Sequence, residues 1–521
     1  MKGSIILLFI VLNSLSSAQE DSLHLVFTLT GTNAENAIYF CSSLGDINHD
    51  NFDDFVIRRK NVNYCEIYYG GKNPNFSKPL KLYDQPNVDM GVLFNIGDIN
   101  GDGFTDYAES GSLNNGGFPS GIIYVFYGST EFDTIPDWSL ISNCIDGLLG
   151  ASASGGDING DGVNDLIIGE PYNWCDGIGR AYLFYGSDSL PGSPDLTFQD
   201  NNNSDFYGEN VCSNGDINGD GYNDVLIAST NMLGFQESKP RVYVYFGKES
   251  ISNLADNIIE VNSGEFRVFY LRDFNGDGLT DFYITISNKI YFGSENFTGE
   301  DALKFISNEP YDNFGETAGY AGDINNDGFS DLILGATGHK NANGVMVGGA
   351  YIYLGSPNPD TTADYFLEGE TKWSTFGLNC GTLGDINGDG YDEFYIIAPQ
   401  YPDTAGTENE LGKIYVYSMK KFLVDVNDND NQMPQKYSLE QNYPNPFNPT
   451  TTINYSVRGK GFAQLKIYDV LGKEIATLVN EEKRQGRYSV KFNGTNLPSG
   501  VYIYTLRVNN FVQSRKMMLL K

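Results

Sequence analysis

An acidic nine-residue loop occurs seven times in this 521-residue chain. Its consensus is Asp-Ile-Asn-Gly-Asp-Gly, followed by two variable residues and a final Asp. The first Asp of each copy follows the previous one by 50 to 62 residues, at Asp46, Asp98, Asp157, Asp216, Asp273, Asp323 and Asp385. A repeat of this length holds four short strands and their turns, the content of one propeller blade. The repeat therefore predicts an all-β fold built around a seven-bladed β-propeller.

Each loop offers oxygen donors at positions 1, 3, 5 and 9, and a backbone carbonyl at position 7. Position 3 is Asn48, Asn100, Asn159, Asn218, Asn275, Asn325 and Asn387, and position 5 is Asp50, Asp102, Asp161, Asp220, Asp277, Asp327 and Asp389. Position 7 is Phe52, Phe104, Val163, Tyr222, Leu279, Phe329 and Tyr391, and position 9 is Asp54, Asp106, Asp165, Asp224, Asp281, Asp331 and Glu393. Such hard oxygen ligands favour Ca²⁺ over Mg²⁺, and no thiol or imidazole recurs for Zn²⁺ or Cu. We expect up to seven calcium ions.

The alternative is a set of Asp-Gly turns that hold no ion. Three carboxylates at fixed offsets would then repel one another, and at least one would be driven to protonate. Position 6 is Gly in six copies and Asn51 in the first, and both residue types accept a left-handed backbone. Position 9 is Glu393 in the seventh copy, so this site is expected to be the weakest. An EF-hand is excluded because position 12 of the third copy, Ile168, lies in a strand-like run.

The rest of each repeat has the pattern of short strands. A short apolar run follows the loop, as at 165–169, and an aromatic-rich segment such as 182–186 comes later. Alternating β-branched and aromatic residues are typical of strands packed on both faces, so these Tyr and Phe side chains are expected between blades. Little room remains for a fourth strand after Ser418, whereas an unpaired strand candidate precedes the first loop at 24–29. We expect this N-terminal strand to complete the last blade and remove free sheet edges.

The repeats resemble the FG-GAP family, found in the N-terminal propeller of integrin α chains and in bacterial surface proteins. The resemblance rests on Phe314-Gly315, the loop at 322–328, Gly335-Ala336, and the equivalent Phe376-Gly377, and it covers about residues 24–422. It implies that the calcium loops join the first and second strands of each blade on one face. It also implies that partners bind on the opposite face.

The formal net charge of −34 makes nucleic acid and anionic membranes poor partners. The first 18 residues resemble a secretory signal peptide, with Lys2 before an apolar run and a cleavage site expected after Ala18. No later segment is apolar enough to span a membrane. Of the six cysteines, Cys41, Cys212 and Cys380 precede loops at equivalent positions, which favours small buried residues over disulfides, although disulfides are permitted outside the cell.

Residues 437–521 form a different domain. An acidic linker at 423–436 separates it from the propeller at 19–422, and short alternating strands between Gly, Pro and Asn turns predict a small Ig-like β-sandwich. The opening at 437–450 and the segments 465–473 and 497–502 resemble the type A sorting domain of the type IX secretion system. The resemblance implies contact with that secretion machinery, then release or attachment at the outer-membrane surface.

The sequence favours a non-catalytic extracellular module that binds a protein or a glycan. The three His residues, His24, His49 and His339, have no motif-level catalytic partner. Candidate contact surfaces are variable loops that carry Trp174, Phe235, His339 and Tyr401, although these side chains could instead anchor their own loops. The alternative function is a propeller-type polysaccharide lyase or another glycan-active enzyme.

Overall fold

The structure is a computed structural model of the whole chain. It describes residues 23–31, 36–76, 79–85, 88–113, 120–129, 135–144, 147–173, 175–200, 206–230, 240–261, 266–307, 309, 311–400, 411–420, 437–439, 442, 445, 447–469, 473–483, 486–495, 497–509 and 511–520. The expected signal peptide and the whole of the expected linker at 423–436 lie outside these residues. So do Trp174, Phe235 and Tyr401.

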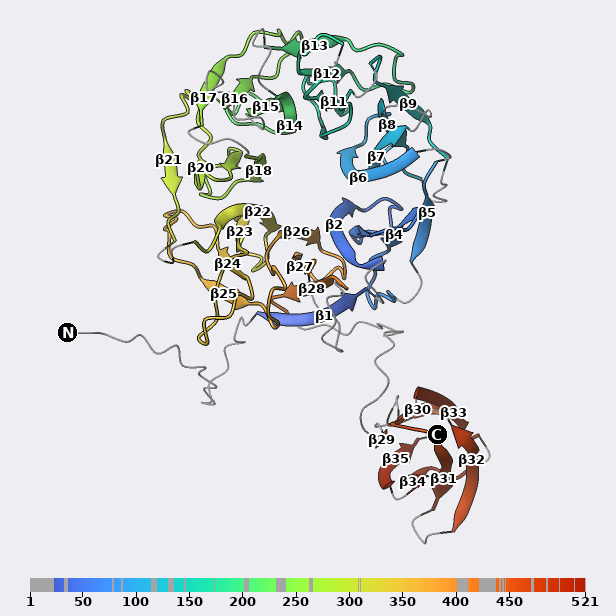
Figure 1. The fold of residues 1–521 in the computed structure, drawn as a ribbon. Coiled ribbons are helices and arrows are strands. Elements are labelled where there is room, and N and C mark those ends of the chain that lie inside the picture. Colours follow the sequence, from blue (N-terminus) through green and yellow to red (C-terminus); the bar gives the residue numbers. More distant parts are fainter. Residues whose placement is uncertain are drawn as a thin grey trace, which may run out of the picture. The chain divides into compact units, whose positions relative to one another are not determined.

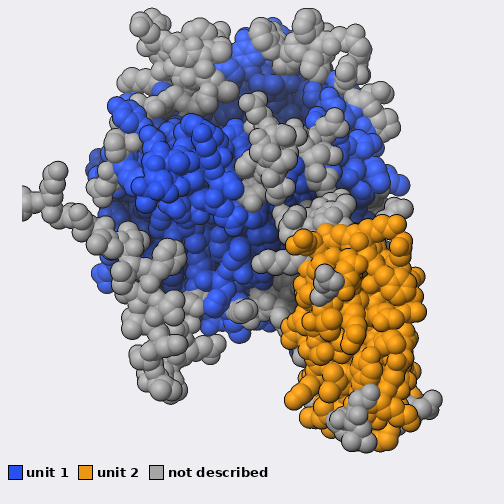
Figure 2. Space-filling view, turned by 60° about the horizontal axis from the view of Figure 1, so that its bottom comes forward, with its two compact units in different colours: residues 1–428 blue, residues 429–521 orange. Residues whose placement is uncertain are grey.

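The chain divides into two compact units, Met1–Asp428 and Asn429–Lys521, coloured separately in Figure 2. The described residues contain strands and no helix. None of them therefore forms a helix long and apolar enough to cross a membrane. The all-β prediction is confirmed.

The described part of the first unit contains seven four-stranded antiparallel sheets, which follow one another around a ring (Figure 1). The first three are β2(Ile38–Gly45), β3(Asp54–Arg59), β4(Tyr64–Tyr68) and β5(Leu80–Tyr83); β6(Val88–Gly97), β7(Asp106–Leu113), β8(Ser120–Phe126) and β9(Trp138–Ile141); and β10(Ala153–Gly156), β11(Asp165–Glu170), β12(Arg180–Phe184) and β13(Leu196–Gln199). The next three are β14(Phe206–Gly215), β15(Asp224–Thr230), β16(Arg241–Tyr245) and β17(Asn257–Glu260); β18(Val268–Arg272), β19(Asp281–Ile284), β20(Lys289–Tyr291) and β21(Ala302–Lys304); and β22(Phe314–Gly322), β23(Asp331–Ala336), β24(Gly349–Tyr353) and β25(Tyr365–Glu368). This is a propeller arrangement.

The seventh sheet joins the two ends of the ring. Its strand order is β1(His24–Thr30), β28(Lys413–Ser418), β27(Glu393–Ala398) and β26(Asn379–Gly384). Antiparallel pairing of β1 with β28 confirms that the N-terminal strand completes the last sheet. Strands from the two ends of the propeller sequence are thus hydrogen-bonded in one sheet, and the ring closes without leaving these strand edges unpaired.

The hydrophobic core lies between neighbouring sheets. One cluster combines Ile167 and Leu183 with Val225 and Tyr245 of the next sheet, all of them buried. An aromatic pair from the second and third strands recurs, as in Tyr107–Phe126 with ring centroids 4.8 Å apart and Phe282–Tyr291 at 5.3 Å. The expected inter-blade role of the aromatic residues is confirmed.

The cysteines divide into two classes. Cys41, Cys65, Cys212 and Cys380 are buried and free, as the repeat pattern predicted for three of them. Cys144 and Cys175 form a disulfide that no repeat pattern indicated.

The second unit has two sheets that share one core. The first has the order β29(Ser438–Leu439), β30(Thr450–Val457), β33(Gly486–Asn493), and the second β32(Glu474–Lys483), β31(Gly461–Tyr468), β34(Gly500–Val508), β35(Phe511–Leu519). Ile453 and Phe492 of one sheet cluster with Leu465 and Tyr504 of the other. Two sheets facing each other across buried side chains form a β-sandwich.

Candidate metal loops and ligand pockets

Each acidic loop connects the first strand of a sheet to the second. The first strand ends just before position 1 of the loop, and the second strand begins at position 9. In the third sheet, β10 ends at Gly156 and β11 begins at Asp165, which is position 9 of the loop. The same placement holds in the other six sheets, so all seven loops lie at one end of their sheets. The structure thus confirms the strand connection that the family resemblance implied.

The third loop is wound around the carboxylate at position 1. Asp157 Oδ1 accepts hydrogen bonds from the backbone N–H groups of Gly160 and Asp161 at 2.7 and 3.1 Å, and Oδ2 accepts one from Gly162 at 3.0 Å. Asn159 Oδ1 accepts from the Asp161 N–H at 2.8 Å. This winding requires a left-handed backbone at positions 4 and 6, where Gly160 and Gly162 have φ of 77° and 89°. In the first loop Asn51 has φ of 69°, as its residue type predicted.

Position 4 has a second constraint, because the position 7 side chain of the next loop packs against it. A Cβ atom at Gly160 would lie 2.5 Å from the Tyr222 ring, and one at Gly276 would lie 2.1 Å from the Phe329 ring. Where position 4 is His49, its ring instead meets Phe104 edge-on at 5.0 Å. The recurring Gly at position 4 is thus explained by contact between neighbouring loops.

Backbone hydrogen bonds also link neighbouring loops. The N–H at position 8 donates to the position 1 carbonyl of the preceding loop in six pairs of described residues: Asn164–Asp98, Asn223–Asp157, Thr280–Asp216, Ser330–Asp273, Asp392–Asp323 and Asp53–Asp385, with distances of 2.8 to 3.2 Å. The last pair joins the first loop to the seventh. The loops therefore form a linked belt on one face of the ring.

The position 9 carboxylates are fully buried at the start of each second strand. Asp165 is 0% exposed, and its Oδ atoms accept from the backbone N–H groups of Ile158 and Gly186, both at 2.9 Å. Burial raises the pKa of Asp165 to about 7, against the effect of these hydrogen bonds, and the nearby Asp161 charge adds to the rise. Burial likewise raises the pKa of Asp54 and Asp331 to about 8, and that of Asp106, Asp224 and Asp281 to about 7. No ion pair between described residues reaches any of these carboxylates.

The donor atoms are of the type that calcium prefers, because the carboxylates, the Asn amide and the position 7 carbonyl all supply oxygen. A divalent cation would offset the buried charge at position 9. In the described residues, however, no three His, Cys, Asp or Glu side chains are grouped closely enough to hold a metal as they stand. In the third loop, the Asn159 amide donates to Asp161 Oδ2 at 2.9 Å. Side chains at positions 3 and 5 would therefore have to turn to admit an ion.

Comparison with known families bears on these repeats. Residues 149–184 and 381–417 match the FG-GAP repeat, 216–284 the FG-GAP-like repeat, and 441–520 the secretion system C-terminal sorting domain. The chain carries FG-GAP repeats and a C-terminal sorting domain. The sorting domain marks the FG-GAP chain for secretion and contact with the type IX machinery.

Several known proteins resemble the FG-GAP chain in part. Integrin alpha-5 from Xenopus laevis is 26% identical over 43% of this chain and 19% of its own length, and integrin alpha-PS2 from Drosophila melanogaster is 35% identical over 20% and 8%. Phosphatidylinositol-glycan-specific phospholipase D from Bos taurus is 24% identical over 69% of this chain and 50% of its own length. The chain thus spans half or less of these relatives. A solved structure of prolyl oligopeptidase B from Galerina marginata matches 82% of this chain and 56% of that chain with 10% identity and a TM-score of 0.44, too weak a likeness to carry an argument.

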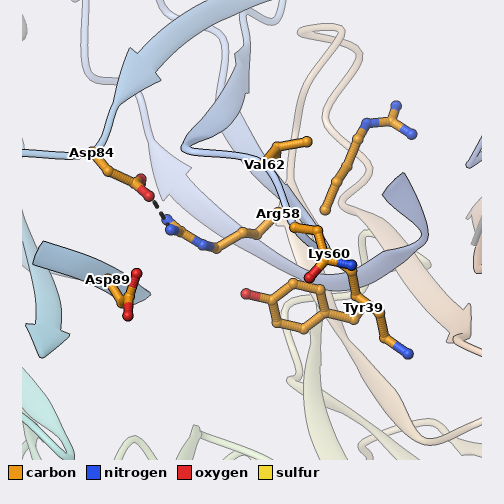
Figure 3. Close-up of a pocket in the computed structure, with 8 residues that line it drawn as sticks. Tyr39, Arg58, Lys60, Val62, Asp84 and Asp89 are labelled. Carbon is orange, nitrogen blue, oxygen red and sulfur yellow. Dashed lines mark hydrogen bonds and ion pairs between the residues drawn. The ribbon is translucent and has the colours of Figure 1, made fainter. Parts of the chain in front are cut away.

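Two pockets of the FG-GAP domain lie at the end of the sheets opposite the acidic loops. Each is lined by residues from the last part of a second strand. One, of about 340 Å³, lies where β3 ends, and Figure 3 shows Tyr39, Arg58 and Lys60 around it. Arg58 is buried and pairs with Asp84 at 3.0 Å and with Glu109 at 2.9 Å. Burial raises the pKa of Glu109 to about 8, although the Arg58 charge opposes the rise. The pocket's cations are thus largely balanced by neighbouring acids.

The second pocket, of about 400 Å³, lies beside the Cys144–Cys175 disulfide. It reaches Glu170, a buried residue at the end of β11. Glu170 accepts hydrogen bonds from the hydroxyls of Ser142 at 2.5 Å and Tyr182 at 2.6 Å. The pocket therefore has a polar wall in which a buried carboxylate is held by two hydroxyls. Its lining includes part of the variable loop at 170–179, which the sequence offered as a candidate contact surface, whereas the contribution of residues 140–144 from the preceding repeat was not predicted.

His339 is buried and therefore is not a surface contact residue. Its side chain is buried, and its ring nitrogens lie 3.0 Å from Glu309 and 3.1 Å from Glu368. The ring also meets Phe366 edge-on at 4.8 Å. His339 thus anchors its own loop, the alternative that the sequence left open.

Proposed function

We propose that this secreted FG-GAP chain is a calcium-stabilised, non-catalytic binding module for an extracellular protein or glycan. The observation that carries this proposal is that the acidic loops and the two pockets lie at opposite ends of the sheets. The acidic loops and their buried position 9 carboxylates occupy one end, where bound cations would stabilise the ring. The opposite end is left for a partner.

The ligand end supports recognition through shape and hydrogen bonds. The Glu170 pocket offers a carboxylate, hydroxyls and the Arg180 guanidinium, which lies beside Asp176 at its rim. Such a mixed polar surface suits hydroxyl-rich or polar partners better than an apolar ligand. The FG-GAP resemblance likewise implies a partner on this end, opposite the acidic loops.

The three His residues do not support catalysis. His24 lies in the closing strand β1, His49 contacts Phe104 in the first loop, and His339 is held between two Glu residues. A general base would instead lie within hydrogen-bond reach of the group from which it takes a proton. The printed ring contacts of His49 and His339 are those of structural side chains.

An enzyme is the second candidate, because a phospholipase D specific for phosphatidylinositol-glycan matches 69% of this chain. Binding to an array of glycans and matrix proteins separates the two functions. Saturable binding without product supports the binding module. Cleavage of an arrayed polysaccharide or of a phosphatidylinositol-glycan would overturn it in favour of the enzyme.

A further inference from the structure

The seventh loop differs from the other six in its internal hydrogen bonds. In loops one to six, the Asn at position 3 accepts from the N–H at position 5, at 2.8 to 3.1 Å. In the seventh, the Asn387 amide instead donates to Glu393 Oε1 at 3.0 Å, and Asn387 is buried. The side chain that should supply a ligand at position 3 is therefore committed to position 9.

Two sequence departures in this sheet accompany the change. The third strand of the other sheets is followed by a Gly whose N–H donates to the position 9 Asp, as Gly186 does to Asp165 at 2.9 Å. In the seventh sheet Ser418 takes that place, and its side chain hydrogen-bonds the longer Glu393. The Glu393 Oε2 atom also accepts from the Ile386 N–H at 3.2 Å. Glu393 is thus satisfied by protein groups on both oxygens.

A lysine supplies positive charge at the same loop. Lys420, just beyond β28, places its Nζ 3.8 Å from Asp389 Oδ2 and donates to the Asp389 carbonyl at 3.4 Å. The ammonium also lies 5.1 Å from the centre of the Tyr391 ring. Among ion pairs between described residues, only this one reaches a ligand position of any acidic loop. The residues at positions 5 and 7 are therefore engaged by a cation of the chain itself.

We propose that Lys420 takes the place of a metal ion in the seventh loop, so that the propeller binds six calcium ions rather than seven. This inference rests on the proposed calcium binding of the other loops. A divalent ion at the seventh loop would be repelled by the ammonium and would have to displace the Asn387–Glu393 bond. Because the seventh sheet also holds the closing strand β1, ring closure does not depend on calcium.

The test compares matched substitutions at position 5 of two loops in the full chain. Bound calcium is counted by equilibrium dialysis at saturating calcium followed by elemental analysis. Wild type is expected to bind six ions, Asp161→Asn five, and Asp389→Asn six. A count that falls by one in Asp389→Asn, or seven ions in wild type, would overturn the inference. No bound calcium in wild type would instead overturn the proposed calcium binding.

Hydrogen exchange in calcium and in EDTA provides a second readout. Chelation should increase exchange at least fivefold in the peptide covering residues 157–164, with little change in the peptide covering 385–392. Lys420→Met should increase exchange at 385–392 in EDTA, whereas Lys248→Met, which removes an exposed lysine paired with Asp256, should not. Equal EDTA sensitivity of the two peptides in wild type would contradict a lysine-filled loop.

Discussion

The Asp53 carboxylate accepts a hydrogen bond from the backbone N–H of Asp385 at 2.8 Å, although 332 residues separate them in the chain. Asp385 begins the seventh acidic loop, and Asp53 lies near the end of the first. The return bond, from the Asp53 N–H to the Asp385 carbonyl, measures 3.2 Å. The first and seventh acidic loops are therefore joined by a reciprocal pair of bonds.

Asp53→Ala should destabilise the propeller by about 1–2 kcal/mol, because it leaves a partly buried N–H without its acceptor. Urea unfolding of the full chain measures the change. Asp188→Ala, which removes an exposed acid, is the control and should change stability by less than about 0.5 kcal/mol. Equal stability of the two variants would show that the Asp53–Asp385 bond contributes nothing to closure.

Phe27→Ala in the closing strand should destabilise the propeller by about 3–5 kcal/mol, as expected for a buried aromatic residue. Phe27 is 7% exposed, and its ring lies 4.8 Å from that of Phe76. Leu25→Ala is the matched control on the same strand, because Leu25 is 48% exposed. A loss no larger for Phe27→Ala than for Leu25→Ala, in denaturant melts, would argue against closure by this strand.

Removal of the Cys144–Cys175 disulfide by a double Ser substitution should destabilise the propeller by up to about 4 kcal/mol. The estimate follows from the loop entropy of a crosslink spanning 31 residues. Dithiothreitol should lower the melting temperature of wild type and leave that of the double variant unchanged. An equal response of both proteins to dithiothreitol would place the reducible bond elsewhere.

Arg58→Met should cost about 3–5 kcal/mol, because it leaves the buried Glu109 without its cation. The double variant Arg58→Met, Glu109→Leu should recover at least half of that loss, since no buried charge then lacks a partner. A double-mutant cycle in urea measures the recovery. If the double variant is as unstable as the sum of the two single variants, the pair is not energetically coupled.

The loops, the strand content and the closing strand could be predicted from the sequence because each repeats a local pattern. Left-handed positions such as Asn51 and Gly162 follow from residue type alone. The loop at 170–179 was a candidate contact surface from the sequence, but the Cys144–Cys175 bond and the pocket that this loop forms with residues 140–144 could not be predicted, because they join two loops without a shared motif. The packing of Tyr222 on Gly160 was missed because it depends on two neighbouring repeats. The sequence did identify Glu393 as the altered ligand, but the contact of Glu393 with Ser418 and that of Asp389 with Lys420 depend on the three-dimensional fold.

Thermal unfolding with and without calcium tests the central claim most directly. Ions that bind only the folded chain add about 2.7 kcal/mol per site at one hundred times Kd. Thorough treatment with EDTA should therefore lower the melting temperature by about 10 °C or more, and added Ca²⁺ should restore it where Mg²⁺ does not. An unchanged melting temperature, together with no calcium in the untreated protein by elemental analysis, would contradict calcium-stabilised folding.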